Sequence, residues 1–203
     1  MSEEQDIYKT IAKQGESLFK DRGSKFFGYV FPVHDEDEFK EKLAGIKTEH
    51  HQARHHCYAY RLDPDEIRYR ANDDGEPSHS AGTPILHALQ SSEVIDVGAV
   101  VVRYFGGTKL GVSGLINAYR TAAEQAIENT KIITKELEYA GQIKTDYAHL
   151  SQVIYFLEQY NASITKRVME YDCQFEFRVR RSVFNELKDK VETLENTSFV
   201  GRN

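Results

Sequence analysis

The sequence predicts an α+β protein of two domains, residues 1–135 and residues 136–203. The first observation is that segments rich in β-branched and aromatic residues alternate with segments whose apolar residues recur every three or four positions. The second is the order of elements after residue 136, which is strand, helix, strand, strand, helix, strand. That order is typical of a ferredoxin-like βαββαβ domain. A chain of 203 residues is long enough to bury a core in each domain.

The first predicted strand covers residues 25–33, KFFGYVFPV, and follows a short helix nearer the N-terminus. Its aromatic and β-branched residues favour a strand, which ends at its proline and at the acidic run 35–38. Acidic residues stabilise the N-terminus of a helix. We therefore predict a helix behind them whose buried face carries three apolar residues, Phe39, Leu43 and Ile46.

The following segments predict a hairpin, a strand and two helices. HHCYAYRL and IRYRA flank DPDE, a turn sequence at 63–66. Thr83 and Pro84 suit the N-cap and first position of a helix over 85–90. An apolar strand then begins at Val97. Ser113 suits the N-cap of a last helix over 114–129, whose apolar stripe is Leu115, Tyr119, Ala122 and Ala126.

The second domain is predicted from its own alternating pattern. Its strands cover residues 138–145, 162–169, 172–180 and a last segment to about 200, and its helices cover 147–160 and 183–194. In strand 172–180 every second residue is apolar, which indicates a sheet with one packed face and one solvated face. The apolar positions are Cys173, Phe175, Phe177 and Val179.

Composition narrows the function classes. The chain has 32 Asp and Glu against 26 Lys and Arg, so its net charge of −6 provides no global attraction to nucleic acid. The longest apolar run, 97–102, is far shorter than the roughly 20 residues of a membrane helix, and the polar N-terminus shows no signal peptide. Cys57 and Cys173 lack any metal-ligand spacing and indicate reduced thiols. We expect a cytoplasmic protein without membrane contact.

The segment Val97–Ala123 contains no acidic residue and is the strongest functional signal. A strand, a glycine turn GGTKLG and a helix start present backbone N–H groups to an anion. The alternative is that the glycines only turn the strand and permit close packing. There is no Walker A or GxGxxG motif, and GVSG matches the short GxxG of KH loops only weakly. We predict an anion or nucleic-acid site made of Arg103, Gly106, Gly107, Lys109, Gly111, Gly114 and Ser78.

The acidic turn DDGEPS, residues 73–78, allows two interpretations. Its carboxylates can ligate metal or act in acid–base chemistry, with Glu76 and His79 as the weak catalytic candidates. Alternatively it is a plain turn in which Glu76 pairs with Arg103 or Lys109 and only organises the site. No Ser, Cys or His arrangement predicts a nucleophile, and Cys57 lies in an apolar strand that favours a buried, inert thiol.

Histidines gather between residues 50 and 56. His51 and His55 have the i, i+4 spacing of a helical metal pair, but the strand predicted from residue 55 makes a helix through His55 doubtful. We therefore predict no metal and no cofactor, and a solvated helix end that runs into a strand. Next to Arg103, Tyr104 and Phe105 offer aromatic faces for base stacking. Because they follow each other in a strand, we expect one of them in the core and the other on the surface.

DDGEPSHSAGTPIL followed by VVVRYFGGTKLGVSGLINAYRTAA, with HHCYAYRL upstream, resembles the hallmark region of the IMPACT/YigZ family. The resemblance extends over essentially the whole chain. It departs at His79, where family members often have glycine. It implies a first domain similar to domain 2 of ribosomal protein S5, a two-layer α/β sandwich, and a second domain similar to the C-terminal region of elongation factor G.

The resemblance also implies a role in translation. Eukaryotic relatives regulate translation through contact with a coactivator of an initiation-factor kinase, and for bacterial members nucleic-acid or ribosome association is proposed. We expect a translation-associated regulator that binds RNA, the ribosome or a translation factor. One alternative is an enzyme for a small phosphorylated or nucleotide substrate, with a concave pocket between the two turns. The other is a pure protein-interaction module, whose binding is independent of Arg103 and Lys109.

Overall fold

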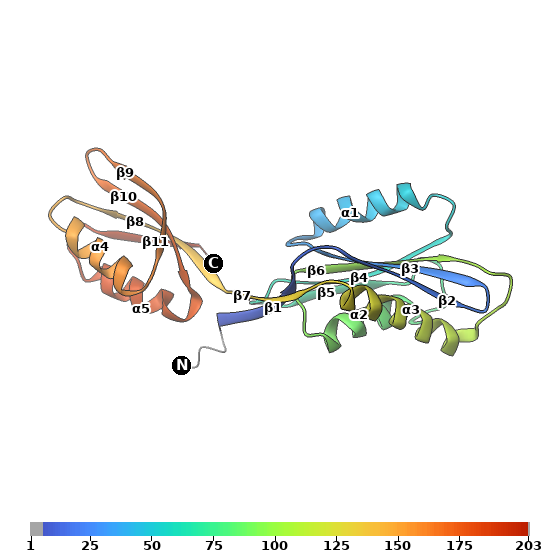
Figure 1. Ribbon diagram of the computed structural model, residues 1–203. Coiled ribbons are helices and arrows are strands. Elements are labelled where there is room, and N and C mark those ends of the chain that lie inside the picture. The colour runs from blue at the N-terminus through green and yellow to red at the C-terminus, as the bar shows by residue number, and fades with distance from the viewer. Residues whose placement is uncertain (1–5, 203) are drawn as a thin grey trace. The chain divides into compact units, whose positions relative to one another are not determined.

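The protein is described by a computed structural model over residues 6–202. These residues form two compact units (Figure 1). One runs from Tyr8 to Lys135, and the other joins Asp6 and Ile7 to the residues after Lys135. A first domain of residues 1–135, as predicted, would include Asp6 and Ile7, which the structure groups with the second unit.

The first unit is built around one antiparallel sheet of five strands, in the order β2-β3-β6-β4-β5. A separate two-stranded sheet pairs β1 with β7. In chain order, the elements up to β7 are β1 (Ile7–Ile11), β2 (Gly15–Asp21), β3 (Ser24–Pro32), α1 (Glu36–Glu49), β4 (His55–Leu62), β5 (Arg68–Asn72), α2 (Gly82–Ser91), β6 (Val97–Tyr104), α3 (Gly111–Glu128) and β7 (Ile132–Glu136).

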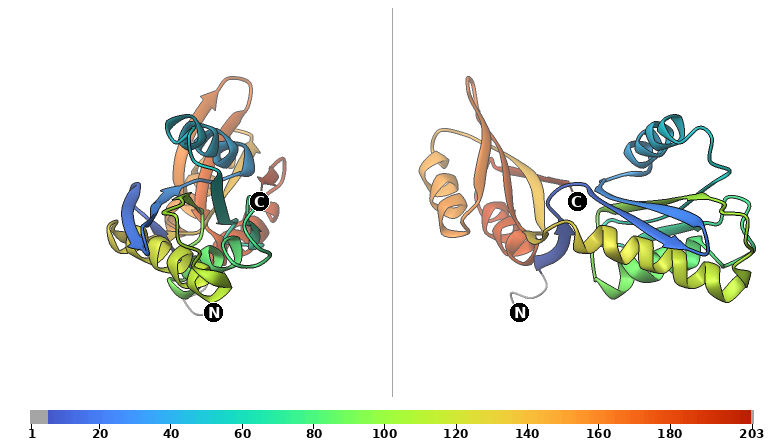
Figure 2. Two further views of the ribbon diagram at one scale, coloured as in Figure 1. Left: turned by 90° about the vertical axis from the view of Figure 1, so that its right-hand side faces the viewer. Right: turned by 45° about the vertical axis from the view of Figure 1, so that its right-hand side comes forward.

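Helices cover both faces of this sheet, α1 on one face and α2 with α3 on the other (Figure 2). On α1, Phe39 packs against Tyr58 and Tyr60 of β4, with ring centroids 5.1 and 5.0 Å apart. On the opposite face, Tyr119 of α3 packs edge-on against Phe26 of β3 at 5.1 Å. The resemblance implies a sandwich of two layers, one sheet and one layer of helices. The structure has this sandwich, and α1 adds a third layer on the opposite face of the sheet. Because β6 is covered on both faces, its sequence is almost continuously apolar rather than alternating.

The prediction of a short helix before residue 25 is wrong. That region forms β1 and β2, and β2 pairs with β3 from Gly15 opposite Val30 to Asp21 opposite Ser24. The side chain of Phe19 packs against Phe26 across this pairing, with ring centroids 6.3 Å apart. Hydrogen bonding to a neighbouring strand thus overrides the weak local helical pattern.

The second unit confirms the ferredoxin-like βαββαβ order. Its elements are β8 (Glu138–Thr145), α4 (Leu150–Gln159), β9 (Ser163–Met169), β10 (Cys173–Arg180), α5 (Arg181–Glu192) and β11 (Ser198–Arg202). The sheet order is β11-β8-β10-β9, and neighbouring strands pair antiparallel. As predicted, alternate residues of β10 enter the core, including Phe175 and Phe177, while Glu176 and Arg178 are exposed.

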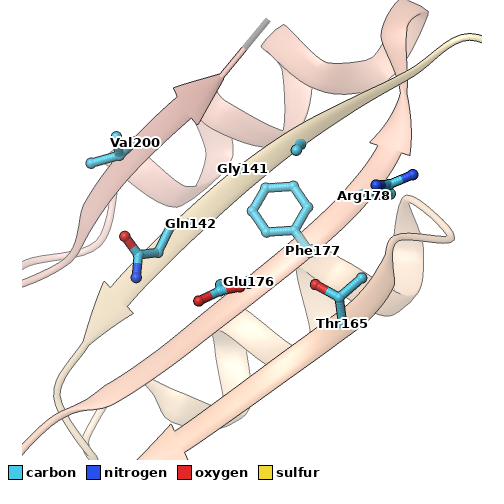
Figure 3. Close-up of a pocket in the computed structure, with 8 residues that line it drawn as sticks. Gly141, Gln142, Thr165, Glu176, Phe177, Arg178 and Val200 are labelled. Carbon is cyan, nitrogen blue, oxygen red and sulfur yellow. The ribbon is translucent and has the colours of Figure 1, made fainter. Parts of the chain in front are cut away.

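The open face of this second sheet is shown in Figure 3. Gln142, Thr165, Glu176 and Arg178 lie around a cavity of about 380 Å³. Lys166 on β9 pairs with Glu176 at 3.3 Å, so opposite charges occur together on this face. The mixed charge distinguishes this face from the basic end of the first unit.

Asp6 belongs to the second unit because its carboxylate holds the start of α5. One carboxylate oxygen accepts the backbone N–H of Ser182 at 2.9 Å, and the other accepts the Ser182 hydroxyl. The Asp6 carbonyl also accepts the N–H of Leu137 at 2.6 Å. Asp6 is itself buried, so it acts as an N-terminal cap supplied from the other end of the chain.

Within the described residues, none of the helices combines the length and the apolar character that crossing a bilayer requires.

Candidate nucleic-acid interface

The glycine turn after β6 is held against the turn that joins β2 to β3. The N–H of Gly106 donates to the Ser24 hydroxyl oxygen at 3.1 Å. A Cβ atom at Gly106 would lie 1.8 Å from the carbonyl carbon of Gly23, so the two backbones meet in a contact that only glycine permits. Both turns lie at the same end of the sheet (Figure 1).

This contact brings three cations to one end of the first unit. Arg22 and Lys25 flank the β2–β3 turn, and Lys109 follows Gly106 in the glycine turn. All three side chains are exposed, and none forms an ion pair with a residue that the structure describes. We call these residues, together with the Gly106–Leu110 turn, the basic tip. Arg22 and Lys25 were not among the predicted site residues, because only the tertiary contact between the two turns places them at the same end of the sheet as Lys109.

Arg103 is not part of the basic tip, because its charge is used inside the protein. Its Nη1 donates to Glu76 Oε1 at 2.6 Å, and the two side chains are only 8% and 4% exposed. The Tyr119 hydroxyl donates to the same carboxylate oxygen at 2.8 Å. Burial raises the pKa of the Tyr119 phenol, which therefore remains a hydrogen-bond donor at neutral pH. We call Glu76, Arg103 and Tyr119 the buried triad.

The buried triad corresponds to the pairing alternative for Glu76. The Arg103 guanidinium also lies over the rings of Phe26 and Phe105, at 5.6 and 5.5 Å from their centroids. These contacts occupy the cation that would otherwise bind a phosphate. They also leave Glu76 without an exposed carboxylate for acid–base chemistry.

The rest of the acidic turn organises the backbone. Asp73 Oδ1 accepts the N–H groups of Ala81 at 3.0 Å and Gly82 at 2.8 Å. Its Oδ2 accepts the N–H of His79 at 2.8 Å. Helix α2 therefore begins at Gly82, capped by Asp73 from eight residues upstream rather than by Thr83.

Helix α3 likewise begins earlier than predicted. It starts at Gly111, whose φ is +73°, so Ser113 lies within the first turn and is not the N-cap. Leu110 occupies the cap position and no side chain caps the helix. Gly111 and Gly114, both predicted site residues, are thus the first and fourth residues of this helix, and the N–H groups of its first three residues have no intrahelical partner.

His79 and Ser78 are exposed beside the acidic turn. The backbone φ of His79 is +61°, in the left-handed region that favours glycine, which gives a physical reason for the glycine often found there in the family. The His79 Nδ1 atom lies 3.1 Å from the Thr83 hydroxyl oxygen.

We expect the His79→Gly variant to be more stable than His79→Ala by about 0.5–1 kcal/mol. Both substitutions remove the ring and its contact with Thr83, but only glycine also removes the Cβ atom from a left-handed backbone. Urea unfolding of the two variants measures the difference. Equal stability would show that the backbone at residue 79 changes its conformation.

The clustered histidines contact protein groups rather than each other's ring nitrogens. His55 Nδ1 lies 2.9 Å from the Asp74 carbonyl oxygen, and His56 Nε2 lies 3.2 Å from the His50 carbonyl oxygen. Because α1 ends at Glu49, His51 and His55 do not share a helix. Among the described residues, no group of three or more His, Cys, Asp or Glu is arranged to hold a metal ion.

His56 makes stability depend on pH, because burial lowers the pKa of its imidazole below the ordinary 6.5. The unfolded chain then takes up a proton near pH 6.5 while the folded protein does not. The free energy of unfolding is therefore expected to fall as pH drops through 6.5, and the slope ends below the folded pKa. Urea unfolding of His56→Gln over pH 7.5 to about 5 should show a smaller slope. The exposed His51→Gln serves as the control and should keep the wild-type slope.

Cys57 is buried, and its thiol donates to the Asp73 carbonyl oxygen at 2.9 Å. Burial raises the pKa of this thiol, so it stays protonated at neutral pH. The geometry is that of an inert cysteine, as the apolar strand predicted.

A cavity of about 310 Å³ lies beside the basic tip. Its lining comes from the β2–β3 turn, from β3, from the end of α1 and from the end of β6, and consists of Gly23, Lys25, Phe27, His50, Tyr104 and Phe105. Neither Glu76 nor His79 lines it. It therefore differs from the pocket between the glycine and acidic turns that the enzyme alternative requires.

The comparisons with known proteins, by family model and by individual relatives, agree with one another. The family model described as the Impact N-terminal domain matches residues 22–127, which include both turns of the basic tip. IMPACT family member YvyE of Bacillus subtilis is 31% identical over 93% of this chain and 87% of its own length. IMPACT family member YigZ of Escherichia coli is 34% identical over 70% of each chain.

A solved crystal structure of a hypothetical protein covers 98% of both chains with a TM-score of 0.73 at 24% identity, which shows that it shares the fold. A domain match over half of the sequence, and a bacterial relative matched over nearly its full length, confirm what the motifs around the glycine turn predicted: this chain belongs to the IMPACT family.

Proposed function

We propose that this chain is a translation-associated regulatory protein that binds single-stranded RNA, free or on the ribosome, through the basic tip. The observation that carries the proposal is the gathering of Arg22, Lys25 and Lys109 at one end of the first unit, without carboxylate partners among the described residues. A protein of net charge −6 attracts RNA only where cations are concentrated locally. The open sheet face of the second unit then provides a separate surface for a partner.

The first turn of α3 supports the same assignment. It belongs to the acid-free segment, and its N–H groups without an intrahelical partner begin at Gly111, two residues after Lys109. Backbone N–H groups and lysine side chains together form the kind of surface that contacts phosphates without selecting a base sequence. The sequence predicts that Arg103 contacts phosphate. In this proposal Lys25 and Arg22 make those contacts instead.

Binding should be salt dependent to a limited extent. Three phosphate contacts on single-stranded RNA predict a slope of about −2 for the logarithm of the affinity against that of the salt concentration. From about 50 to about 200 mM salt the affinity should therefore fall roughly twentyfold.

Lys109→Gln is expected to reduce that slope by about 0.7 and to weaken binding at every salt concentration. Co-sedimentation with ribosomes, and titration of a labelled single-stranded RNA over a salt series, measure both effects. Lys42→Gln on α1 is the matched control, because Lys42 is also exposed but lies away from the tip. Asp21→Asn should instead strengthen RNA binding, because it removes a negative charge that stands next to Arg22 in the sequence.

Two results would contradict the proposal. The first is that wild-type protein binds neither ribosomes nor RNA at low salt. The second is binding that Lys109→Gln and Lys42→Gln reduce equally, which would exclude the basic tip as the contact surface. Ribosome binding that persists in Lys109→Gln at high salt would indicate a protein partner instead.

A further inference from the structure

The cavity beside the basic tip has walls made mainly of rings. The rings of Phe27, His50 and Tyr104 pack against one another, with centroids 5.2 Å (Phe27–His50), 5.7 Å (Phe27–Tyr104) and 5.8 Å (His50–Tyr104) apart. Phe105 also lines the cavity and is 59% exposed, and the Arg103 guanidinium lies over its ring, 5.5 Å from the centroid. At about 310 Å³ the cavity is large enough for one planar heterocycle.

Two of the lining side chains, His50 and Tyr104, form a hydrogen-bonded row with Tyr29. The Tyr29 hydroxyl lies 2.6 Å from His50 Nε2, and the Tyr104 hydroxyl lies 3.0 Å from His50 Nδ1. A neutral imidazole carries one proton, so one of the two tyrosines donates to it and the other accepts from it. Whichever tyrosine accepts keeps its own hydroxyl proton for another partner.

The burial of Tyr29 decides which tyrosine that is. Tyr29 is only 7% exposed, and within the described residues its hydroxyl has no hydrogen-bond partner besides His50. If Tyr29 accepted from His50, its own proton would be buried without an acceptor, which is costly. Tyr29 therefore donates to Nε2, and Nδ1–H donates to the Tyr104 oxygen. The hydroxyl proton of Tyr104, a residue that lines the cavity, is left for a ligand.

The cavity thus combines three features. It has an exposed ring face on Phe105, a free hydroxyl donor on Tyr104, and the cation of Lys25 among its lining residues. An unpaired nucleobase matches all three, since it has a π-face, ring or exocyclic acceptor atoms, and a phosphate one sugar away. An aromatic amino-acid side chain has the π-face, and in tyrosine and histidine an acceptor atom, but no phosphate for Lys25.

We propose that this cavity binds one unpaired base of RNA. The base stacks on Phe105 and accepts a hydrogen bond from the Tyr104 hydroxyl, while Lys25 contacts the adjoining phosphate. This inference rests on the proposed function and gives it a recognition element. It makes the protein a reader of single strands, because a base within a duplex is stacked and paired and does not reach the cavity.

The test compares tetrauridylate with an abasic ribose-phosphate chain of the same length, for wild type and four variants. Wild type should bind the base-containing chain about tenfold more tightly than the abasic chain, and Phe105→Ala should abolish that preference. Tyr104→Phe keeps the ring and should weaken only tetrauridylate binding, by about fivefold. Tyr69→Ala is the matched control, because Tyr69 is 62% exposed on β5 and outside the cavity. Lys109→Gln should weaken both chains equally.

A spectroscopic readout reports stacking directly. The chain has no tryptophan, so 2-aminopurine placed in the oligonucleotide can be excited beyond the tyrosine absorption. Its fluorescence should be quenched by wild type and by Tyr69→Ala but not by Phe105→Ala. Circular dichroism verifies that each variant is folded.

The outcomes separate the two proposals. Salt-dependent binding of both chains with equal affinity, weakened by Lys109→Gln but unchanged in Phe105→Ala, would overturn the base-binding cavity and leave the basic tip intact. Failure of wild type to bind either chain at low salt would overturn both. Loss of the base preference in Phe105→Ala, with quenching absent, is the result we expect.

Discussion

Replacing Glu76 by alanine should lower the free energy of unfolding by about 3–5 kcal/mol. The substitution leaves the Arg103 charge buried without its partner, since the Arg103 side chain is only 8% exposed. It also removes the oxygen to which the Tyr119 hydroxyl donates at 2.8 Å. Urea unfolding followed by circular dichroism measures the loss, and Arg103→Ala should cost a similar amount.

Two controls separate burial from ion pairing. Lys9 and Glu93 pair at 2.6 Å, the same separation as in the buried triad, but their side chains are 51% and 70% exposed. Glu93→Ala should therefore change stability far less than Glu76→Ala does. The double variant Glu76→Leu/Arg103→Met should be more stable than either single loss, because neither charge is then left alone. A loss in Glu76→Ala as small as that in Glu93→Ala would contradict the buried triad.

This expectation changes how RNA binding has to be tested. A variant that lacks Arg103 loses binding through unfolding whether or not Arg103 contacts RNA. Lys109 is exposed and unpaired among the described residues, so its replacement tests the surface without disturbing the core.

Gly106→Ala is expected to cost about 3 kcal/mol. The added Cβ atom would lie 1.8 Å from the carbonyl carbon of Gly23 and 2.2 Å from the backbone nitrogen of Ser24. Both neighbours are backbone atoms and cannot rotate away, so one of the two turns must shift. The shift separates Lys109 from Lys25, and RNA affinity should fall together with stability.

Two other glycines provide controls with different signs. Gly107 has a φ of +90° but open space around it, so Gly107→Ala should cost only about 1–2 kcal/mol of backbone strain. Gly45 lies within α1 with no atom in the way, and Gly45→Ala should stabilise the protein by about 1 kcal/mol. A Gly106→Ala variant no less stable than Gly107→Ala would show that the turns do not meet closely.

The sequence indicates which segments form the candidate site. It does not indicate which of their charged side chains are buried and which are exposed. The acid-free segment, the glycine turn and the acidic turn were identified from residue types alone. Nothing in residue type distinguishes Arg103, which is ion-paired and buried, from Lys109, which is exposed. The partner of Arg103 is 27 positions away in the chain, and the second donor to Glu76 is 43 positions away.

The sequence by itself determined the element order of the second unit and the central strand of the first. These patterns are local, because alternation along β10 and the apolar run of β6 report directly how each strand is covered. Only the tertiary structure decided that β2 is a strand, that α1 adds a layer, and that Arg22 and Lys25 join Lys109. Each of these depends on a contact between segments far apart in the chain, as between Gly106 and Ser24, 82 positions apart. Such contacts leave no periodic signal, because only one or two residues of each segment take part in them.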